Sequence, residues 1–171
     1  MKQIKWFERK FDFSNKQNIF PSIIERLKGT PVLLDYKISR ITDQDLRDKF
    51  QGGWSIQENI GHLIDLEPVW LGRLQDILNG DEMMRHIDLE NTKTHLANHN
   101  SRNAKDLVKE FRHVRSVLVS HLEKLSNEEV FKSSLHPRLN TPMRIMDLFL
   151  FVAEHDDHHL ARINEITKAL K

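Results

Sequence analysis

The sequence predicts an all-α fold, a four-helix bundle preceded by an N-terminal arm. Apolar residues recur at helical spacing along nearly the whole chain, and the 6 Gly and 5 Pro fall mostly where helices would begin or end. The 171 residues divide into four principal helical segments. A chain of this length suits one domain, so we expect residues 1–171 to form a single helical-bundle domain with residues 1–19 as the arm.

The arm contains the aromatic and basic segment IKWFERKFDF, and we expect Trp6, Phe7, Phe11 and Phe13 to pack on the bundle. Aromatic residues among basic ones also occur in proteins that stack nucleic-acid bases. The chain has no wider basic patch, and its 26 Lys and Arg against 25 Asp and Glu give a net charge of +1. We therefore expect no nucleic-acid partner.

The first helical pattern covers residues 21–28 and stops at Gly29. Thr30 as a cap and Pro31 in the first turn then predict a second segment that ends near Arg40. The next helix lies in WSIQENIGHLIDLEPVWLGRLQDIL, where Ser55 and Glu58 have the spacing of a capping box. Pro68 predicts a kink or a local break within it.

Residues 80–102 are polar and predict a long connection with about one helical turn. A third long helix fits residues 103–124, and Ser126 with Glu129 forms a second capping-box pair. After the loop SSLHPRLN, the last helix is expected to begin with Thr141 as cap and Pro142 at its first position, and to reach about residue 169.

Two histidines interrupt the apolar stripe of this last helix. Adding His155 and His159 to its apolar positions gives an unbroken series at spacings of three and four, whereas His158 lies about 100° away on the flank. The rings are one turn apart, about 6 Å along the axis, so both can reach one ion. The alternative is two hydrogen-bonded core histidines. The apolar positions are Ile145, Leu148, Val152, Ile163, Ile166 and Leu170.

A third ligand is needed from another helix, and His62 in ENIGHLIDLE is the candidate. That helix is apolar around most of its circumference, so we expect it to be enclosed by neighbours, among which a second subunit can be one. Glu58 or Asp65 could orient the His62 ring as a hydrogen-bond acceptor. The simpler reading makes Glu58 a helix cap and Asp65 a solvated residue.

The remaining histidines are weaker candidates for a metal site. His95 and His99 are also four apart, but no apolar stripe surrounds them. His136 precedes the last helix and fits a turn role, or a place at the mouth of a site. Three further residues read as surface or packing positions: His86, His113 and His121.

The segment HDDHH also has the histidine spacing of HExxH metalloproteases. Asp156 stands where those proteins have glutamate, and only 12 residues follow His159, so we reject that class. The chain has no cysteine, which excludes disulfides and thiolate ligands. It has no signal-peptide pattern and no stretch near the roughly 20 apolar residues of a membrane helix, so we expect a cytoplasmic protein without a membrane partner.

GGWSIQENIGHLIDLE, followed by HPRLNTPMRIMDLFLFVAEHDDHHLARI, resembles the DinB-like (YfiT-like) superfamily of four-helix-bundle proteins over about residues 20 to 166. The resemblance rests on a Trp-Ser helix start, an isolated histidine in the second helix and His-x-x-x-His in the last. By position it implies that His62, His155 and His159 bind a divalent metal ion, zinc or nickel. It also implies that dimers are common, so we expect a homodimer.

The resemblance further implies a thiol S-transferase that uses bacillithiol, mycothiol or glutathione against an electrophilic substrate, in stress response or detoxification. One alternative is a metal-dependent hydrolase in which metal-bound hydroxide attacks and Glu58 accepts the proton. Another is a bundle whose metal is not catalytic and which acts as a binding or stress-response protein. The absence of cysteine means that a nucleophilic sulfur would have to come from outside the protein.

Overall fold

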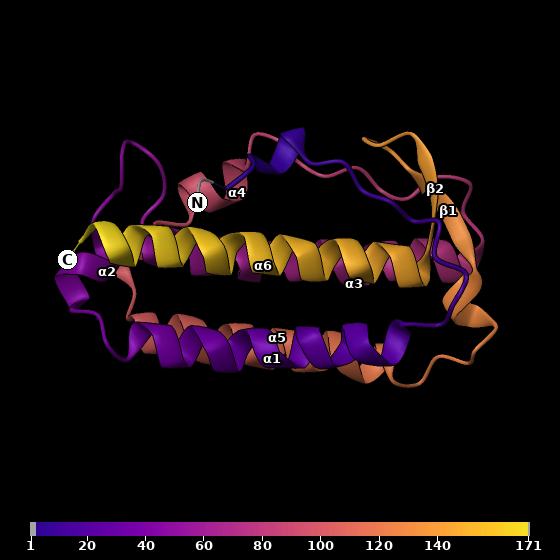
Figure 1. Cartoon of the computed structure of the whole chain (residues 1–171), viewed down its shortest axis with the longest axis horizontal. Helices are drawn as coiled ribbons and strands as arrows, with labels where there is room; N and C mark the ends of the chain where they lie inside the picture. Colours follow the sequence, from indigo (N-terminus) through magenta and orange to yellow (C-terminus); the bar gives the residue numbers. More distant parts are fainter. Residues whose placement is uncertain (1–2, 171) are drawn as a thin grey trace.

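The computed structural model describes residues 3–170, and its four long helices run side by side along the long axis of the molecule (Figure 1). Helix α1 packs against α5 and α6, and helix α3 packs against the same two, which makes a four-cornered bundle. The predicted all-α four-helix bundle is therefore confirmed. The four helices are α1 (Phe20–Ile38), α3 (Ile56–Asn79), α5 (Ala104–Leu122) and α6 (Ile145–Ala169).

The N-terminal arm contains a 3-10 turn at Trp6–Glu8, and short elements connect the four helices. They are α2 (Asp43–Arg47), α4 (Thr92–Leu96), 3-10 turns at His99–Ser101 and Glu129–Phe131, and strands β1 (Ser133–His136) and β2 (Thr141–Arg144). The strands form an antiparallel hairpin in which His136 lies opposite Thr141. The arm and the α3–α5 connection run along α3 and α6, on the side away from α1 and α5 (Figure 1).

Helix α1 is continuous where the sequence predicted two segments. Pro31 has no amide to donate to the carbonyl oxygen of Leu27, four residues earlier, which is the usual reason for a break. Here Nη1 of Arg115 lies 3.3 Å from that oxygen and donates to it instead. Thr30 is not a cap but a buried residue, 2% exposed, whose hydroxyl donates to Asp156. A side chain from another helix thus satisfies the carbonyl that Pro31 leaves free.

Two further boundaries differ from the predictions. Helix α3 continues through Pro68 without a break, one of the two outcomes that this proline predicted. The last helix begins at Ile145, because Thr141 and Pro142 belong to strand β2. Pro142 needs no ladder hydrogen bond there, since a two-stranded hairpin has only edge strands. The Thr-Pro pair that resembled a helix start is therefore part of the hairpin.

The predicted capping signals elsewhere are confirmed. Ser55 and Glu58 form a reciprocal capping box at the start of α3. Ser126 and Glu129 bond each other's amides in the same manner. Asn103, which was predicted only as the first residue of its helix, caps α5 through its side chain. The two capping boxes could be identified from the sequence because each needs only residues three positions apart.

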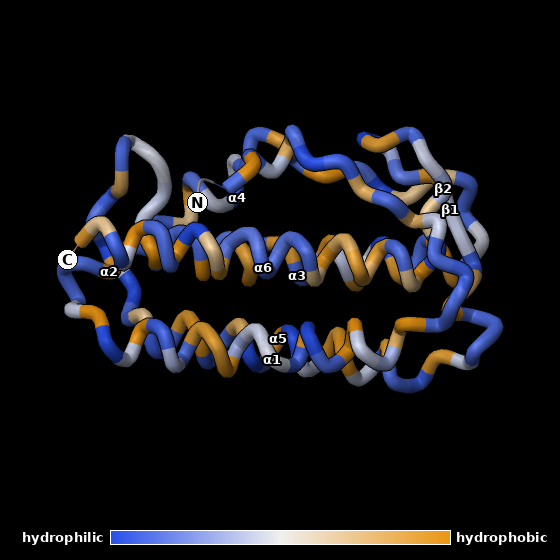
Figure 2. Tube along the Cα trace, viewed as in Figure 1, coloured by the Kyte–Doolittle hydropathy of each residue, from blue (hydrophilic) through white to orange (hydrophobic). Residues whose placement is uncertain are grey.

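The core consists of two apolar clusters with a buried polar layer between them. Hydrophobic residues recur along the helices towards both ends of the bundle (Figure 2). One cluster lies towards the hairpin and includes Trp70 and Phe149, and the other lies towards α2 and includes Leu34 and Phe111. Between them are Thr30, Glu67, Arg115 and Asp156, together with three histidines: His62, His155 and His159.

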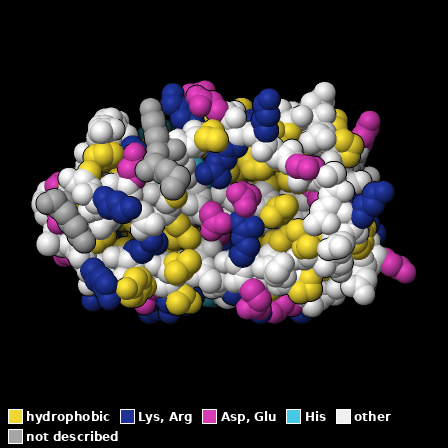
Figure 3. Space-filling view, viewed as in Figure 1, with side chains coloured by type: hydrophobic (Ala, Val, Ile, Leu, Met, Phe, Trp, Pro, Cys, Tyr) yellow, Lys and Arg dark blue, Asp and Glu magenta, His cyan; other side chains and the backbone are white. Residues whose placement is uncertain are grey.

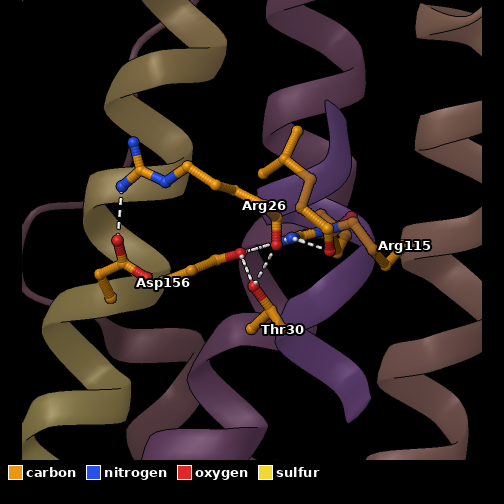
Figure 4. A network of polar contacts seen from close by, with 7 residues as sticks. Arg26, Thr30, Arg115 and Asp156 are labelled. Atoms are coloured by element: carbon orange, nitrogen blue, oxygen red, sulfur yellow. Dashed lines mark hydrogen bonds and ion pairs between the residues drawn. The ribbon is translucent and has the colours of Figure 1, made fainter. Parts of the chain in front are cut away.

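Arg115 is the centre of the polar layer and joins three helices (Figure 4). Its Nε and Nη2 donate to Oε1 of Glu67 on α3 at 3.0 and 2.6 Å, and its other contacts are with Asp156 on α6 and Leu27 on α1. Burial lowers the pKa of Arg115, but the carboxylates of Asp156 and Glu67 outweigh it and raise the pKa. Arg115 therefore stays charged in the interior and fixes α6 against α1 and α3.

The visible face of the molecule carries acidic and basic side chains interspersed, without a large area of one sign (Figure 3). This agrees with the near-zero net charge of the sequence. Within residues 3–170, no helix has the length and apolar character required to cross a membrane.

Candidate metal centre

Three histidines from two helices meet at the polar layer. His62 comes from α3, and His155 and His159 come from successive turns of α6. One ring nitrogen of each lies within 4.8 Å of the corresponding atoms of the other two. All three are buried, at 4%, 5% and 6% exposed. The structure thus brings together the three histidines selected from the stripe and the resemblance.

Asn59 fixes the ring of His159. The Asn59 Nδ2 donates to the carbonyl oxygen of Ser55 at 2.7 Å, so its Oδ1 faces His159 Nδ1 at 2.8 Å. Because Oδ1 can only accept, Nδ1 carries the proton and Nε2 keeps its lone pair. Asn59 was not singled out in the sequence, since an asparagine one turn after a helix start has no distinguishing pattern.

Thr94 on α4 does the same for His62. Its hydroxyl donates to Oδ2 of Asp65 at 2.9 Å and lies 3.1 Å from His62 Nδ1. Because the Thr94 hydroxyl donates its proton in the hydrogen bond to Asp65, its oxygen accepts from Nδ1–H of His62. His62 Nε2 therefore keeps its lone pair. Asp65, 8% exposed, therefore supports His62 through Thr94 rather than by direct contact, and it is not the solvated residue of the simpler reading.

His99 completes this support. It is 3% exposed and its Nε2 lies 2.9 Å from Oδ2 of Asp65. A Cβ at position 61 would lie 2.2 Å from the His99 ring, so Gly61 allows this ring to lie against α3. No apolar stripe surrounds His99 in the sequence, because this residue is buried from a short 3-10 turn, which needs none. His95 lies beside Trp54, with ring centroids 5.7 Å apart, and takes no part in the three-histidine cluster.

The cluster fits a divalent metal ion. Nε2 of His155 and Nε2 of His159 are 3.2 Å apart, close enough for one shared proton or for one ion between them. His155 Nδ1 is buried and has no hydrogen-bond partner among the described residues, and Nε2 is the nitrogen of this ring that faces the cluster. Neutral imidazoles with free Nε2 atoms are the ligands that zinc and nickel accept.

Burial keeps these rings neutral. The pKa of His62 is lowered to about 4, chiefly by desolvation, although the Asp65 carboxylate opposes the shift. Burial and the neighbouring histidines lower the pKa values of His155 and His159 well below the usual 6.5. Neutral rings at ordinary pH are required for metal binding.

A cavity of about 470 Å³ opens beside the three histidines. Part of its wall is the arm, whose Trp6 ring lies 4.9 Å from those of Phe151 and His155. Phe11 and Phe13 also pack against the core, as predicted, but Phe7 is 60% exposed. The expectation for Phe7 was wrong: it lies beside the Arg138 guanidinium, 5.2 Å from its Cζ, rather than in the core.

Other residues selected from the sequence have different places. Glu58 accepts from the Ser55 amide, and its Oε1 lies 3.2 Å from Nζ of Lys49. Glu58 therefore acts as a helix cap, and among the described residues it forms no hydrogen bond with His62. His136 has the predicted turn role, because its Nδ1 accepts from two amides of the hairpin loop, and it also lines the cavity. The exposed positions of the remaining three agree with the surface prediction: His86, His113 and His121.

Comparison with known proteins places these features in context. A family model described as the DinB superfamily matches residues 26–163. Among curated proteins, none matches the sequence significantly. A solved structure of YfiT from Bacillus subtilis, described as a probable metal-dependent hydrolase with an unusual four-helix bundle topology, superposes with a TM-score of 0.81 at 21% identity, over 95% of this chain and 94% of that one.

Two other solved structures share the fold. A mycothiol-dependent maleylpyruvate isomerase has a TM-score of 0.66 at 11% identity, over 83% of this chain and 59% of that one. The colibactin self-resistance protein ClbS, solved in complex with double-stranded DNA, has a TM-score of 0.68 at 17% identity, over 90% of this chain and 98% of that one. At these identities the likeness establishes the fold alone.

Proposed function

This chain belongs to the DinB superfamily, and from that premise we propose that it is a metal-dependent enzyme in which His62, His155 and His159 hold one divalent ion. The observation that carries the proposal is the set of three buried, neutral imidazoles, of which Asn59 and Thr94 orient two. When bound, an ion held by three imidazoles would have an open coordination position at which to lower the pKa of a thiol or a water.

We propose thiol S-transfer as the reaction, with an external low-molecular-weight thiol and a small electrophile as substrates. The cavity is large enough for a small molecule, and aromatic rings form much of its wall: Trp6, Trp54, Trp70 and Phe151. The chain has no cysteine, so the sulfur comes from the substrate. The protein's part is to hold both molecules beside the histidines and to exclude water with the arm.

The contacts of the nearby carboxylates favour transfer over hydrolysis. A hydrolase needs a base for its water, and Glu58, the candidate for that role, is engaged in the capping box. Asp156 is buried and paired with Arg115. His158 lines the cavity as a neutral ring, because burial, Arg9 and Arg162 lower its pKa to about 4, so it is a poor base at neutral pH.

Hydrolysis remains the second candidate, supported by the likeness to YfiT, which is described as a probable metal-dependent hydrolase. The two reactions are separated by incubating zinc- or nickel-loaded protein with p-nitrophenyl acetate or 1-chloro-2,4-dinitrobenzene, with and without bacillithiol, mycothiol or glutathione. Product that requires the thiol supports transfer. Metal-dependent release of p-nitrophenol at an equal rate without thiol would instead establish hydrolysis.

Metal analysis tests the site itself. Elemental analysis of the purified protein should find about one ion per chain, and the variants His62→Ala, His155→Ala and His159→Ala should each lose it. The matched control is His158→Ala, which removes an adjacent imidazole outside the cluster and should keep the metal. Circular dichroism of the His159→Ala variant should show a folded bundle, since the apolar stripe of α6 remains. A chelator that unfolded the protein would favour a structural metal and the non-catalytic alternative.

A further inference from the structure

The end of the cavity near the hairpin carries a basic cluster that the metal centre does not use. It consists of Arg73 on α3, His136 at the end of β1, and Arg138 in the hairpin loop, and all three line the cavity. Arg73 and His136 are each 1% exposed. Over residues 3–170, no carboxylate forms a hydrogen bond or an ion pair with Arg73 or Arg138, so this positive charge has no partner within the described chain.

The cluster contains more donors than acceptors. His136 Nδ1 accepts from the amides of Arg138 and Leu139, at 3.2 and 3.1 Å. The proton of the neutral ring therefore lies on Nε2, which is 3.0 Å from Nη1 of Arg73. Since a guanidinium can only donate, two N–H groups face each other here without an acceptor.

Further donors lack partners at the same place. Nη2 of Arg73 and Nη2 of Arg138 are both buried, and neither has a hydrogen-bond partner in the described part of the chain. Burial lowers the pKa of Arg73 to about 10, with Arg138 and Arg85 acting in the same direction and Asp76 against it. Burial together with Arg73 and Arg138 lowers the pKa of His136 to about 4. Buried donors of this kind usually have an acceptor, so the cluster is complete only with an external one.

We propose that Arg73, His136 and Arg138 form an oxyanion-binding subsite, which takes the carboxylate or phosphate group of a small-molecule substrate. Guanidinium groups bind both anions through parallel N–H donors. The subsite deepens the proposed function by naming the class of substrate, and in that respect rests on it. The binding of the anion itself does not require the metal.

The aromatic wall links this subsite to the histidines. The Trp70 ring lies 5.5 Å from Cζ of Arg73 and 6.1 Å from the His155 ring. Phe151 similarly lies 5.5 Å from the His136 ring and contacts Trp6. A substrate with an apolar or aromatic body can therefore lie against Trp70 and Phe151, with its anionic group at the arginines and its reactive group near the three histidines.

Isothermal titration calorimetry with benzoate, phenyl phosphate and the neutral isostere benzamide tests the subsite on zinc-loaded and chelator-treated protein. We expect benzoate or phenyl phosphate to bind both forms at least about tenfold more tightly than benzamide. The variant Arg138→Gln should lower the affinity for the anion at least about tenfold. Arg138 is only half-buried, so it can be replaced without opening the core. The control is Arg162→Gln, which removes another cavity arginine that is paired with Glu165 and should change the affinity less than about twofold.

Two results would overturn the proposal. Equal affinity for benzoate, phenyl phosphate and benzamide, or no binding of the anions, would mean that the cavity is merely apolar. Binding of the anions only in the zinc-loaded form would place them on the metal. Failure of the proposed enzyme function can be distinguished from failure of the subsite. If the protein binds no metal or transfers no thiol but still binds the anion through Arg138, the enzyme function is wrong and the subsite stands.

Discussion

His159 donates from Nδ1 to Oδ1 of Asn59, 2.8 Å away on helix α3. We expect Asn59→Leu to weaken zinc affinity by about 10- to 100-fold, because the ring loses the acceptor that fixes its tautomer and orientation. Competition against a chromogenic chelator measures the affinity. Asn59→Asp, which keeps an acceptor oxygen, should retain most of it. Unchanged affinity in Asn59→Leu would mean that the hydrogen bond does not position His159.

Thr94 offers a second test, because its hydroxyl joins His62 to Asp65. The isosteric variant Thr94→Val removes both hydrogen bonds without changing the volume of the side chain appreciably. We expect about tenfold weaker zinc binding in the same competition assay. Thr92→Val on the exposed face of α4 is the matched control and should bind zinc as the natural chain does. Equal affinities for the two variants would contradict the role of Thr94.

Arg115 should dominate the stability of the polar layer. Replacing it by methionine leaves Glu67 and Asp156 buried without a counter-charge and leaves the Leu27 carbonyl without a donor. We expect the free energy of unfolding to fall by about 3–5 kcal/mol in urea denaturation. Arg112 lies on the same helix as Arg115, and Arg112→Met, which breaks an exposed contact with Asp35 on α1, should cost less than about 1 kcal/mol. Similar losses for the two variants would show that the buried network contributes little.

His62 contributes to the pH dependence of stability. Its pKa is about 4 in the folded chain and ordinarily 6.5, so between these values the unfolded chain binds a proton that the folded chain excludes. The free energy of unfolding of chelator-treated protein should therefore rise with pH over this range, by up to about 1.4 kcal/mol per unit from this residue, and the contribution should be level above it.

Urea denaturation at several pH values checks this sign. His62→Gln should reduce the slope by up to about one proton, whereas His113→Gln, at an exposed position on α5, should leave it unchanged. A slope in the His62→Gln variant equal to that of the natural chain would mean that His62 titrates alike in both states.

Features that depend on a single helix could be predicted from the sequence. The spacing of His155 and His159 within the apolar stripe, and the capping boxes at Ser55 and Ser126, need only the geometry of an α-helix. His62 was the candidate for the third ligand from its place on an apolar helix, which is less specific than the pair on α6, and the resemblance selects the same residue. These residues are therefore the part of the candidate site that the sequence identifies.

Features that depend on a partner from another helix were missed. Gly29, Thr30 and Pro31 predicted a break between two helical segments, because no local signal shows that Arg115 would satisfy the Leu27 carbonyl. Asn59 and Thr94 carry no pattern that marks them as partners of histidines. Thr141 and Pro142 have the spacing of a helix start, but pairing with β1 places them in a strand. In each case a tertiary contact overrides the local preference.

The three tryptophans of the chain all lie on the wall of the cavity. Trp6 and Trp70 are 4.9 and 6.1 Å from the His155 ring, and Trp54 is 4.6 Å from that of His62. The tryptophan fluorescence of this protein therefore originates entirely around the candidate metal centre. Binding of a quenching ion such as nickel should lower the intensity of this emission, and binding of zinc should shift its wavelength. If the arm loosens, the emission of Trp6 should move to longer wavelength. One spectrum of the unlabelled protein therefore reports on metal, ligand and arm.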